Sequence, residues 1–307
     1  MIFNEKRLMV TNQGFKLQGT LATPEGSSDH AVIIMPGSGQ VNQDGNHKKF
    51  QSNLYRDLAY FLYEIGVPSL RFDKRGTGMS EGTFNETGLS DFISDAAVWM
   101  RELKKHYNRI TLIGHSEGAI TGPAVMKLEP ADGFIFLCGF MGTGEELIAY
   151  QRELLQKEVQ QTTGFKKYLF KILRVEKNIE KSSKSVDQKI AQTTAPAIKY
   201  RGTTINAKWI REMKAYHITD FMNSVPCRSL AIEGARDIQI KPGSAAEFAS
   251  FSGAEHIVIS DMNHILRRRD RPHSLLGLQK EYQKDLRDKD LHPELLKQLK
   301  IWFSNSN

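Results

Sequence analysis

A serine at the tip of a predicted sharp turn is the first candidate for chemistry in this sequence. The apolar run 110–113 predicts a strand, a helix is predicted to follow Ser116, and Gly114 and Gly118 flank the serine two positions away on either side. A strand-to-helix turn this tight excludes side chains at the flanking positions and lifts the serine hydroxyl to the carboxyl edge of a sheet. A nucleophile needs this geometry, and the strand and helix are the context that a chance G-x-S-x-G string lacks.

A serine hydroxyl attacks poorly unless a histidine takes its proton and a carboxylate orients that histidine. In a parallel sheet, groups that meet Ser116 must follow a strand, because the carboxyl ends of the strands share one edge. His264 follows the predicted strand 256–259 and is our candidate for the base, with His273 further along the same loop as the fallback. His115 lies inside the turn, and we expect its side chain to point away from the serine.

The orienting carboxylate should lie at the same edge of the sheet. Asp237 stands four residues beyond the predicted strand 228–233 and is our candidate for this acid. Glu233 is an alternative, but we expect it to lie within that strand. Asp261 is too close in sequence to His264 to reach its far ring nitrogen easily, so we expect it to cap a turn. The chain order of nucleophile, acid and base is expected for one fold in particular.

Two backbone donors should face the oxyanion that forms when a serine attacks a carbonyl group. The N–H of Glu117 is one, because this residue follows the serine at the start of the predicted helix. We expect the other from the loop 36–39, which follows the predicted strand 31–35, and Ser38 is our choice of donor. A glycine-rich loop could instead cradle a phosphate, but the G-K-S/T and G-x-G-x-x-G patterns are missing here.

The segment 73–78 resembles a phosphate loop only superficially. We expect Asp73 and Arg75 to fix a loop beside the site through paired charges. The histidines and cysteines of the chain lack the spacing of zinc ligands. We therefore predict no metal and no cofactor.

The elements that position these residues alternate along the chain. Continuous apolar runs predict strands buried on both faces, and amphipathic helices are predicted between them. An amino-terminal hairpin, 7–22, precedes this series. Strands that alternate with helices predict an α/β fold with a mostly parallel central sheet flanked by helices. We assign residues 1–141 and 223–307 to this core.

The alternation stops for about eighty residues after the sixth predicted strand. We predict helices at 145–160, 165–180, 185–190 and 206–221, and no strand between them. We interpret 142–222 as a helical cap inserted into the core, with a separate small helical domain as the alternative. Its larger apolar residues are expected in its own core rather than in a pocket wall: Phe165, Tyr168, Phe170, Trp209 and Met213.

Composition limits the partners of the chain. The net charge is +7, and residues 142–222 carry fifteen Lys and Arg against nine Asp and Glu, which leaves about +1 for the remainder. These lysines alternate with apolar residues at helical spacing, which favours solvated helix faces over a nucleic-acid surface. No apolar run is long enough to span a membrane, and no signal peptide is expected in the first ten residues. Cys138 and Cys227 lie in apolar surroundings, which favours a cytoplasmic protein. The sequence leaves open whether the chain forms a homodimer.

With these residues in place, the sequence resembles the α/β-hydrolase superfamily, most closely bacterial serine esterases related to dienelactone hydrolases and to the catalytic domains of the prolyl oligopeptidase type. The motifs that carry the resemblance lie at 36–39, 44–46, 71–80, 114–118, 234–237 and 263–264. The resemblance implies Ser116 as nucleophile, Asp237 as acid and His264 as base. Pro36 departs from the histidine that many relatives have in this loop, but the oxyanion donor is a backbone N–H in either case.

The expected activity is hydrolysis of small-molecule carboxylic esters through an acyl-enzyme on Ser116, with the cap setting the size of the acyl group. A peptidase or amidase acting on short peptides and an acyl-CoA thioesterase are the alternatives among enzymes. A hydrolase-fold scaffold without catalysis is a further alternative, but such proteins usually lose a member of the triad.

Overall fold

The computed structural model describes residues 3–26, 28–164, 175–288 and 290–305. Phe165, Tyr168 and Phe170 lie outside these residues, and so does the first part of the predicted helix 165–180.

An eight-stranded sheet forms the centre of the molecule, with the strands in the order β1-β2-β6-β3-β7-β8-β11-β12. The strands are β1 (Glu5–Asn12), β2 (Phe15–Ala22), β3 (His30–Met35), β6 (Ser69–Phe72), β7 (Arg109–His115), β8 (Gly133–Leu137), β11 (Arg228–Gly234) and β12 (Glu255–Ile259). The hairpin β1–β2 and the β2–β6 pair are antiparallel, and the other neighbouring pairs are parallel. The prediction of a mostly parallel sheet is therefore confirmed.

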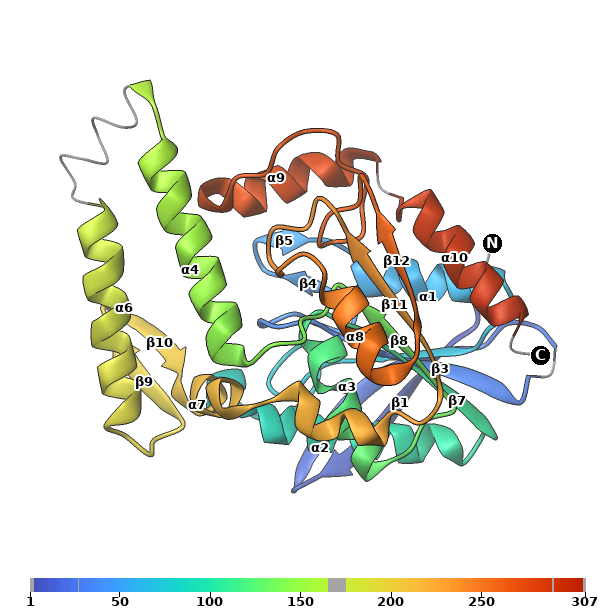
Figure 1. Cartoon of the computed structure of the whole chain (residues 1–307). Coiled ribbons are helices and arrows are strands. Elements are labelled where there is room, and N and C mark those ends of the chain that lie inside the picture. Colours follow the sequence, from blue (N-terminus) through green and yellow to red (C-terminus); the bar gives the residue numbers. More distant parts are fainter. Residues whose placement is uncertain (1–2, 27, 165–174, 289, 306–307) are drawn as a thin grey trace.

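Helices cover both faces of this sheet (Figure 1). They are α1 (Leu54–Glu64), α2 (Leu89–Lys104), α3 (Glu117–Leu128), α8 (Ser244–Ser252) and α10 (Pro293–Ser304), while α9 (Leu278–Asp285) lies beyond the ends of the strands. Alternation along β8 sets the two faces, because successive side chains of a strand point to opposite sides. The ring of Phe136 stacks on Phe248 of α8 at 4.5 Å between centroids, whereas a Cβ at Gly133 would lie 2.7 Å from the ring of Trp302 in α10. The core thus has two apolar layers, one on each side of the sheet.

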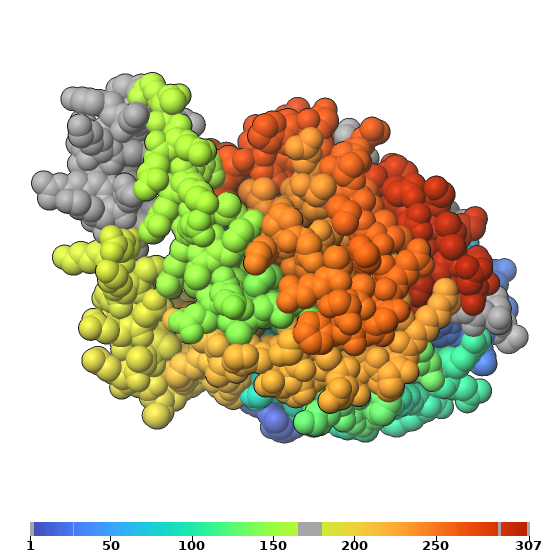
Figure 2. All heavy atoms as spheres, viewed as in Figure 1, coloured from blue at the N-terminus to red at the C-terminus, as the bar shows by residue number. Residues whose placement is uncertain are grey.

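The segment between β8 and β11 contains α4 (Gly144–Gln161), α6 (Val175–Ala191), α7 (Ala207–Ala215) and the 3-10 helix η2 (Ile218–Ser224). Figure 1 places α4 and α6 side by side at the end of the molecule away from both termini, and Figure 2 shows α4 between α6 and the core. The boundaries of a cap at 142 and 222 stay a prediction.

The expectation that this segment has no strand was wrong. Strands β9 (Ala197–Tyr200) and β10 (Thr203–Asn206) form an antiparallel hairpin. Its two-residue turn, Arg201 and Gly202, has positive φ angles of 47° and 78°, which is the backbone twist that a tight hairpin favours. The helix expected over 206–221 is also shorter, because α7 ends at Ala215 and η2 follows as a separate element.

The remaining elements are short: β4 (Asn46–His47), β5 (Phe50–Gln51), η1 (Phe84–Glu86), η3 (Leu275–Gly277) and η4 (Leu286–Asp288). Strands β4 and β5 form a small hairpin before α1. In the part of the chain that is described, none of the helices combines the length and the apolar character needed to cross a bilayer.

Candidate active site

Ser116 joins the end of β7 to the start of α3 with a φ angle of 54°, a conformation that costs a non-glycine residue energy. The flanking glycines make this turn possible. A Cβ at Gly114 would lie 2.4 Å from the carbonyl oxygen of Gly118, and one at Gly118 would lie 2.4 Å from the carbonyl oxygen of Met35. Both contacts are with backbone, so neither can be relieved by moving a side chain.

The three residues predicted from the ends of strands meet in one hydrogen-bonded series. The Oγ atom of Ser116 lies 3.0 Å from Nε2 of His264, and Nδ1 of His264 lies 2.6 Å from Oδ2 of Asp237. An ionised carboxylate only accepts hydrogen bonds, so Nδ1 carries the proton and Nε2 presents a lone pair to the serine hydroxyl. The structure brings the three side chains together, while their roles in catalysis stay predictions.

Asp237 is held on both sides of its carboxylate. Its Oδ1 accepts a hydrogen bond of 2.8 Å from the backbone N–H of Gln239, while its Oδ2 accepts from His264. The buried thiol of Cys138 also lies beside it, and burial, helped by this carboxylate, raises the pKa of the thiol well above its usual value. Cys138 therefore stays protonated next to Asp237.

Cys138, Asp237 and His264 offer three atoms within 4.8 Å of one another, which is close enough to hold a metal ion. However, Asp237 and His264 are hydrogen-bonded to each other, and a metal ligand must be deprotonated, whereas the thiol is not. The chemistry of this donor set therefore suits a hydrogen-bonded acid better than a metal centre.

The loop that carries His264 is fixed by buried arginines. Arg269 pairs with Asp285 of α9 at 2.8 Å, and the same carboxylate accepts a bond of 2.9 Å from the side chain of Asn263. Arg267 pairs with Asp57 of α1 at 2.5 Å. Both arginines are fully buried, and each forms an ion pair. The loop that carries His264 is therefore held to α1 and α9 by buried ion pairs.

The alternative residues have other partners. Glu233 lies in β11, as expected, and its carboxylate accepts from the N–H groups of Gly243 and Ala245 at the start of α8. Asp261 accepts hydrogen bonds from Arg268 and His292. The fallback base, His273, has its Nε2 3.5 Å from Asp285 rather than near the serine.

The loop predicted to supply an oxyanion donor lies against the nucleophile. A Cβ at Gly37 would lie 3.1 Å from Cβ of Ser116, a tight contact that would require the neighbouring atoms to move. The N–H of Gly37 donates a bond of 2.6 Å to the hydroxyl of Tyr55, and its carbonyl oxygen accepts a bond of 2.7 Å from Nζ of Lys74. The N–H groups of Ser38 and Glu117 have no hydrogen-bond partner among the described residues, so both remain available to an oxyanion.

The sequence missed two residues of this loop's surroundings, Tyr55 and Lys74. The predicted pairing of Asp73 with Arg75 was also wrong: Arg75 pairs with Asp95 at 2.5 Å, and Asp73 accepts from backbone N–H groups, including that of Gln43 at 2.7 Å. The signal for Lys74 was a lysine two positions after the end of a buried strand, at the carboxyl edge of the sheet where the site lies.

His115 also has a larger part than the sequence suggested. Its side chain points away from the serine, but its Nδ1 lies 3.0 Å from the hydroxyl of Tyr55 and its Nε2 lies 2.8 Å from the carbonyl oxygen of His264. Burial, together with the nearby His264, lowers the pKa of His115 to about 3, so the ring is neutral. A neutral ring can donate at one nitrogen and accept at the other, as these contacts require.

Two cavities meet at Ser116. The larger, of about 270 Å³, is bordered by Ser38, Ser116 and His264 and by polar residues such as His47 and Gln279. The smaller, of about 80 Å³, is bordered by Glu117 and by mostly apolar side chains of α3, α4 and α7: Ile120, Leu147, Ile148, Trp209 and Met213. Trp209 and Met213 thus line a cavity, against the expectation that they would lie only in the core of the cap. A cavity of about 550 Å³ elsewhere contains none of the predicted site residues.

The mostly parallel sheet, with a serine on a strand-to-helix turn and an acid and a histidine after later strands, is the α/β-hydrolase fold. Residues 48–265, more than half of the chain, match the family described as serine aminopeptidase, S33. The chain belongs to this family.

A known relative is an esterase. Esterase EstD of Thermotoga maritima is 25% identical over 274 residues, a match that covers 86% of this chain and 60% of that protein. The chain therefore spans about three fifths of the length of this relative.

Solved structures show the same fold at low identity. Est1E of Butyrivibrio proteoclasticus, with ferulic acid bound, is 16% identical with a TM-score of 0.59, over 92% of this chain and 98% of that one. An esterase of Pyrococcus furiosus is 19% identical with a TM-score of 0.57, over 86% of this chain and 84% of that one.

Proposed function

We propose that this protein is a carboxylesterase that uses Ser116 as nucleophile. The observation that carries the proposal is the series from the serine hydroxyl through His264 to Asp237, with distances of 3.0 and 2.6 Å. The similarity to Esterase EstD supports an ester as the substrate.

The proposed reaction has two halves. Oγ of Ser116 attacks the ester carbonyl carbon while Nε2 of His264 takes the hydroxyl proton, and the N–H groups of Ser38 and Glu117 stabilise the oxyanion. The imidazolium of His264 then gives its proton to the alcohol as the bond to the acyl carbon breaks. Water attacks the acyl-enzyme by the same route and releases the acid. Asp237 keeps the imidazole in the tautomer that both halves need.

We assign the alcohol and acyl parts of the ester to the two cavities. His264 must protonate the leaving alcohol, so the alcohol lies on the side that His264 borders, in the cavity of about 270 Å³. The acyl group then points to the other side, into the apolar cavity of about 80 Å³ under α4 and α7. The proposed substrates are therefore esters of short-chain acids, with a larger and more polar alcohol.

The direct test is turnover of p-nitrophenyl acetate and butyrate. We expect a burst of p-nitrophenol followed by steady hydrolysis, and loss of both in Ser116→Ala, since acylation requires the nucleophile. Turnover by the wild type no faster than by this variant, on every ester tried, would refute the proposal.

An aminopeptidase activity is the second candidate, favoured by the description of the family. Such an enzyme needs a carboxylate to bind the α-ammonium group of a peptide. None lines the larger cavity in the described part of the chain, and in the smaller cavity the carboxylate of Glu117 is already bound by Lys74 and Trp209. Comparing p-nitrophenyl acetate with aminoacyl p-nitroanilides separates the two, and acetyl-CoA hydrolysis tests the thioesterase alternative.

We also propose a cytoplasmic location, which is supported by the absence of a disulfide at Cys138 and Cys227. Fractionation of cells that express the tagged protein tests this location.

A further inference from the structure

A buried ammonium group lies directly behind the predicted oxyanion hole. Nζ of Lys74 donates to the carbonyl oxygen of Gly37 at 2.7 Å and to Oε1 of Glu117 at 3.2 Å. The side chain of Lys74 is only 4% exposed, and its Nζ lies over the ring of Phe92 at 4.9 Å from the centroid. A buried lysine keeps its charge only when a partner compensates for the lost water, and Glu117 is that partner.

The two bonds of Lys74 reach the peptide unit that carries one predicted oxyanion donor and the side chain of the residue that carries the other. The carbonyl oxygen of Gly37 belongs to the same peptide unit as the N–H of Ser38, and in a trans peptide these two groups point in opposite directions. Lys74 therefore fixes the direction of the Ser38 N–H by holding the other end of the unit. Its second partner, Glu117, carries the other donor N–H. A single ammonium group thus couples the two halves of the hole.

The carboxylate of Glu117 has a third partner, from the segment between β8 and β11. Its Oε2 accepts a hydrogen bond of 2.7 Å from Nε1 of Trp209, which lies on α7. Both carboxylate oxygens are therefore occupied, one by Lys74 and one by Trp209. The position of α7 consequently affects the geometry of a pair that lies beside the nucleophile.

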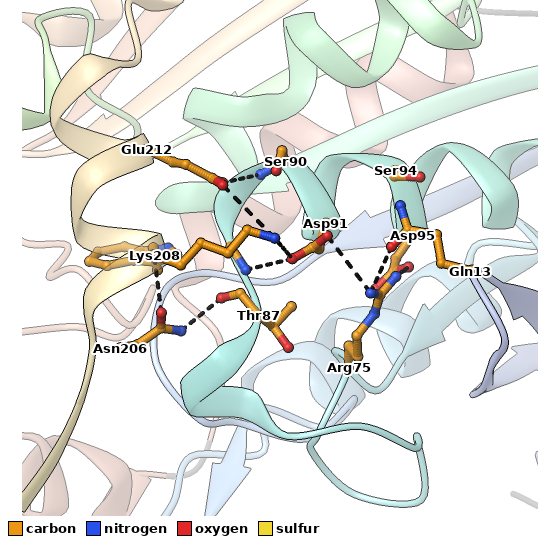
Figure 3. Close-up of polar contacts among 12 residues, drawn as sticks. Gln13, Arg75, Thr87, Ser90, Asp91, Ser94, Asp95, Asn206, Lys208 and Glu212 are labelled. Carbon is orange, nitrogen blue, oxygen red and sulfur yellow. Dashed lines mark hydrogen bonds and ion pairs between the residues drawn. The ribbon is translucent and has the colours of Figure 1, made fainter. Parts of the chain in front are cut away.

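Helix α7 is itself held by polar contacts with α2 and with the turn that precedes α2 (Figure 3). The side-chain amide of Asn206 donates to the carbonyl oxygens of Phe84 and Thr87 at 2.8 and 2.7 Å. Nζ of Lys208 lies 2.6 Å from Oδ2 of Asp91, and Glu212 accepts from the N–H of Ser90 at 2.8 Å. These bonds set α7 at a defined place over the core.

We propose that Lys74 and Glu117 are positioning residues for the oxyanion hole, and that α7, seated on α2, holds this pair in place through Trp209. The inference rests on the proposed esterase function, since it concerns the same hole. Its consequence is that contacts far from the serine affect the chemical step: loosening α7 lowers kcat, because the donors lose their fixed direction, while binding of a small ester changes little.

Trp209→Phe tests the proposal most directly, because it keeps a six-membered aromatic ring and removes the N–H that binds Glu117, together with the five-membered part of the indole that borders the smaller cavity. We expect kcat on p-nitrophenyl acetate to fall about tenfold with KM changed less than about twofold, a partial loss compared with removal of a whole donor. Affinity for a trifluoromethyl ketone, which forms a tetrahedral adduct on the serine, should fall by the same factor as kcat/KM. The matched control is Trp302→Phe on α10, the same substitution on a helix outside the site, which should leave kcat unchanged.

Lys208→Met tests the seating of α7, with Lys199→Met as its control. Both remove one positive charge from the same segment, but Lys199 lies exposed on β9 and makes none of the contacts with α2. We expect only Lys208→Met to lower kcat, with the rate partly restored by Lys208→Arg, which can still reach Asp91. Melting temperatures show that each variant is folded.

For the buried pair, the double variant Lys74→Met with Glu117→Gln avoids a lone buried charge. We expect it to fold and to lose about a hundredfold in kcat, the loss typical of removing an oxyanion donor. Unchanged kcat in Trp209→Phe and Lys208→Met would overturn this inference alone. A wild-type protein without turnover that depends on Ser116 would overturn both this inference and the proposed function.

Discussion

The Nε2 atom of His115 lies 2.8 Å from the main-chain carbonyl oxygen of His264, so the residue before the predicted nucleophile is bound to the backbone of the predicted base. A carbonyl oxygen only accepts, and the N–H of Gly37 at the other end of this series only donates. These two ends fix the direction of every bond between them. Gly37 donates to Tyr55, Tyr55 donates to Nδ1 of His115, and His115 donates from Nε2 to His264. The oxyanion loop and the base are therefore aligned by one buried series.

We predict that His115→Phe lowers both stability and activity. The phenyl ring fills the same space but leaves the Tyr55 hydroxyl and the His264 carbonyl buried without this partner, at a cost of about 2–4 kcal/mol in the free energy of unfolding. We expect kcat to fall about tenfold, as misaligned donors stabilise the oxyanion less. Urea unfolding and ester hydrolysis measure the two effects. His115→Gln, which can donate to the same carbonyl, should recover part of both, and no recovery would argue against the series.

The neutral state of His115 predicts how stability depends on pH. Burial lowers its pKa in the folded protein to about 3, against an ordinary value of 6.5. Below about pH 6.5 the unfolded chain binds a proton that the folded chain does not, so the free energy of unfolding falls as the pH decreases towards 3. The contribution of His115 to this slope approaches about 1.4 kcal/mol per pH unit. Urea titrations between about pH 7 and 4 should show a shallower slope for His115→Phe than for the wild type. Parallel slopes would show that this ring does not contribute.

The two-cavity assignment predicts separate changes of substrate preference. Leu147→Ala enlarges the smaller cavity, so hexanoyl and octanoyl esters should gain in kcat/KM relative to acetyl esters, by about tenfold for every two methylene groups that become buried. Leu278→Ala, on the side of the larger cavity, should change the preference among alcohols and leave the order of acyl groups as it is. A chain-length series of p-nitrophenyl esters and an alcohol series of butyrates measure the two effects. The assignment is reversed if the two variants exchange these effects.

Gly118→Ala should prevent or severely weaken folding. The added Cβ would lie 2.4 Å from the carbonyl oxygen of Met35, and strand β3 would have to move to accept it. We expect a loss of at least about 3 kcal/mol, the upper range for overpacking a core. Gly277→Ala is the control, because its Cβ would meet nothing closer than the Ser274 hydroxyl at 3.9 Å. Thermal unfolding of the two variants provides the comparison, and similar melting temperatures would show that the turn is less tight than described.

The sequence was sufficient to predict the fold and the residues that meet at the sheet edge. Asp237 and His264 follow different strands, and parallel strands deliver whatever follows them to one edge, so their meeting with Ser116 depends on topology alone. The tight turn at Ser116 could also be predicted, because Gly114 and Gly118 stand close to the serine in the sequence and a tight turn excludes side chains at those positions.

Contacts that depend on distant packing could not be predicted in this way. Arg267 appears in the sequence as part of a basic run, and its partner Asp57 is 210 positions away on another helix. Lys74 follows a strand as the site residues do, but only the packed loop reveals that it binds the carbonyl of Gly37 rather than a substrate. Trp209 has a hydrophobic ring typical of a core, and its role depends on one N–H meeting Glu117.

In the proposed reaction, with the acyl group in the smaller cavity, the unequal spaces beside Ser116 also determine where the second half of the reaction takes place. Once the alcohol has departed, the acyl chain still fills the smaller space, and the vacated chamber next to His264 is the place where a water molecule can be activated. A small alcohol dissolved in the medium can occupy the same chamber and intercept the acyl-enzyme. The partition between free acid and a newly formed ester would then be governed by how well that alcohol fits the chamber.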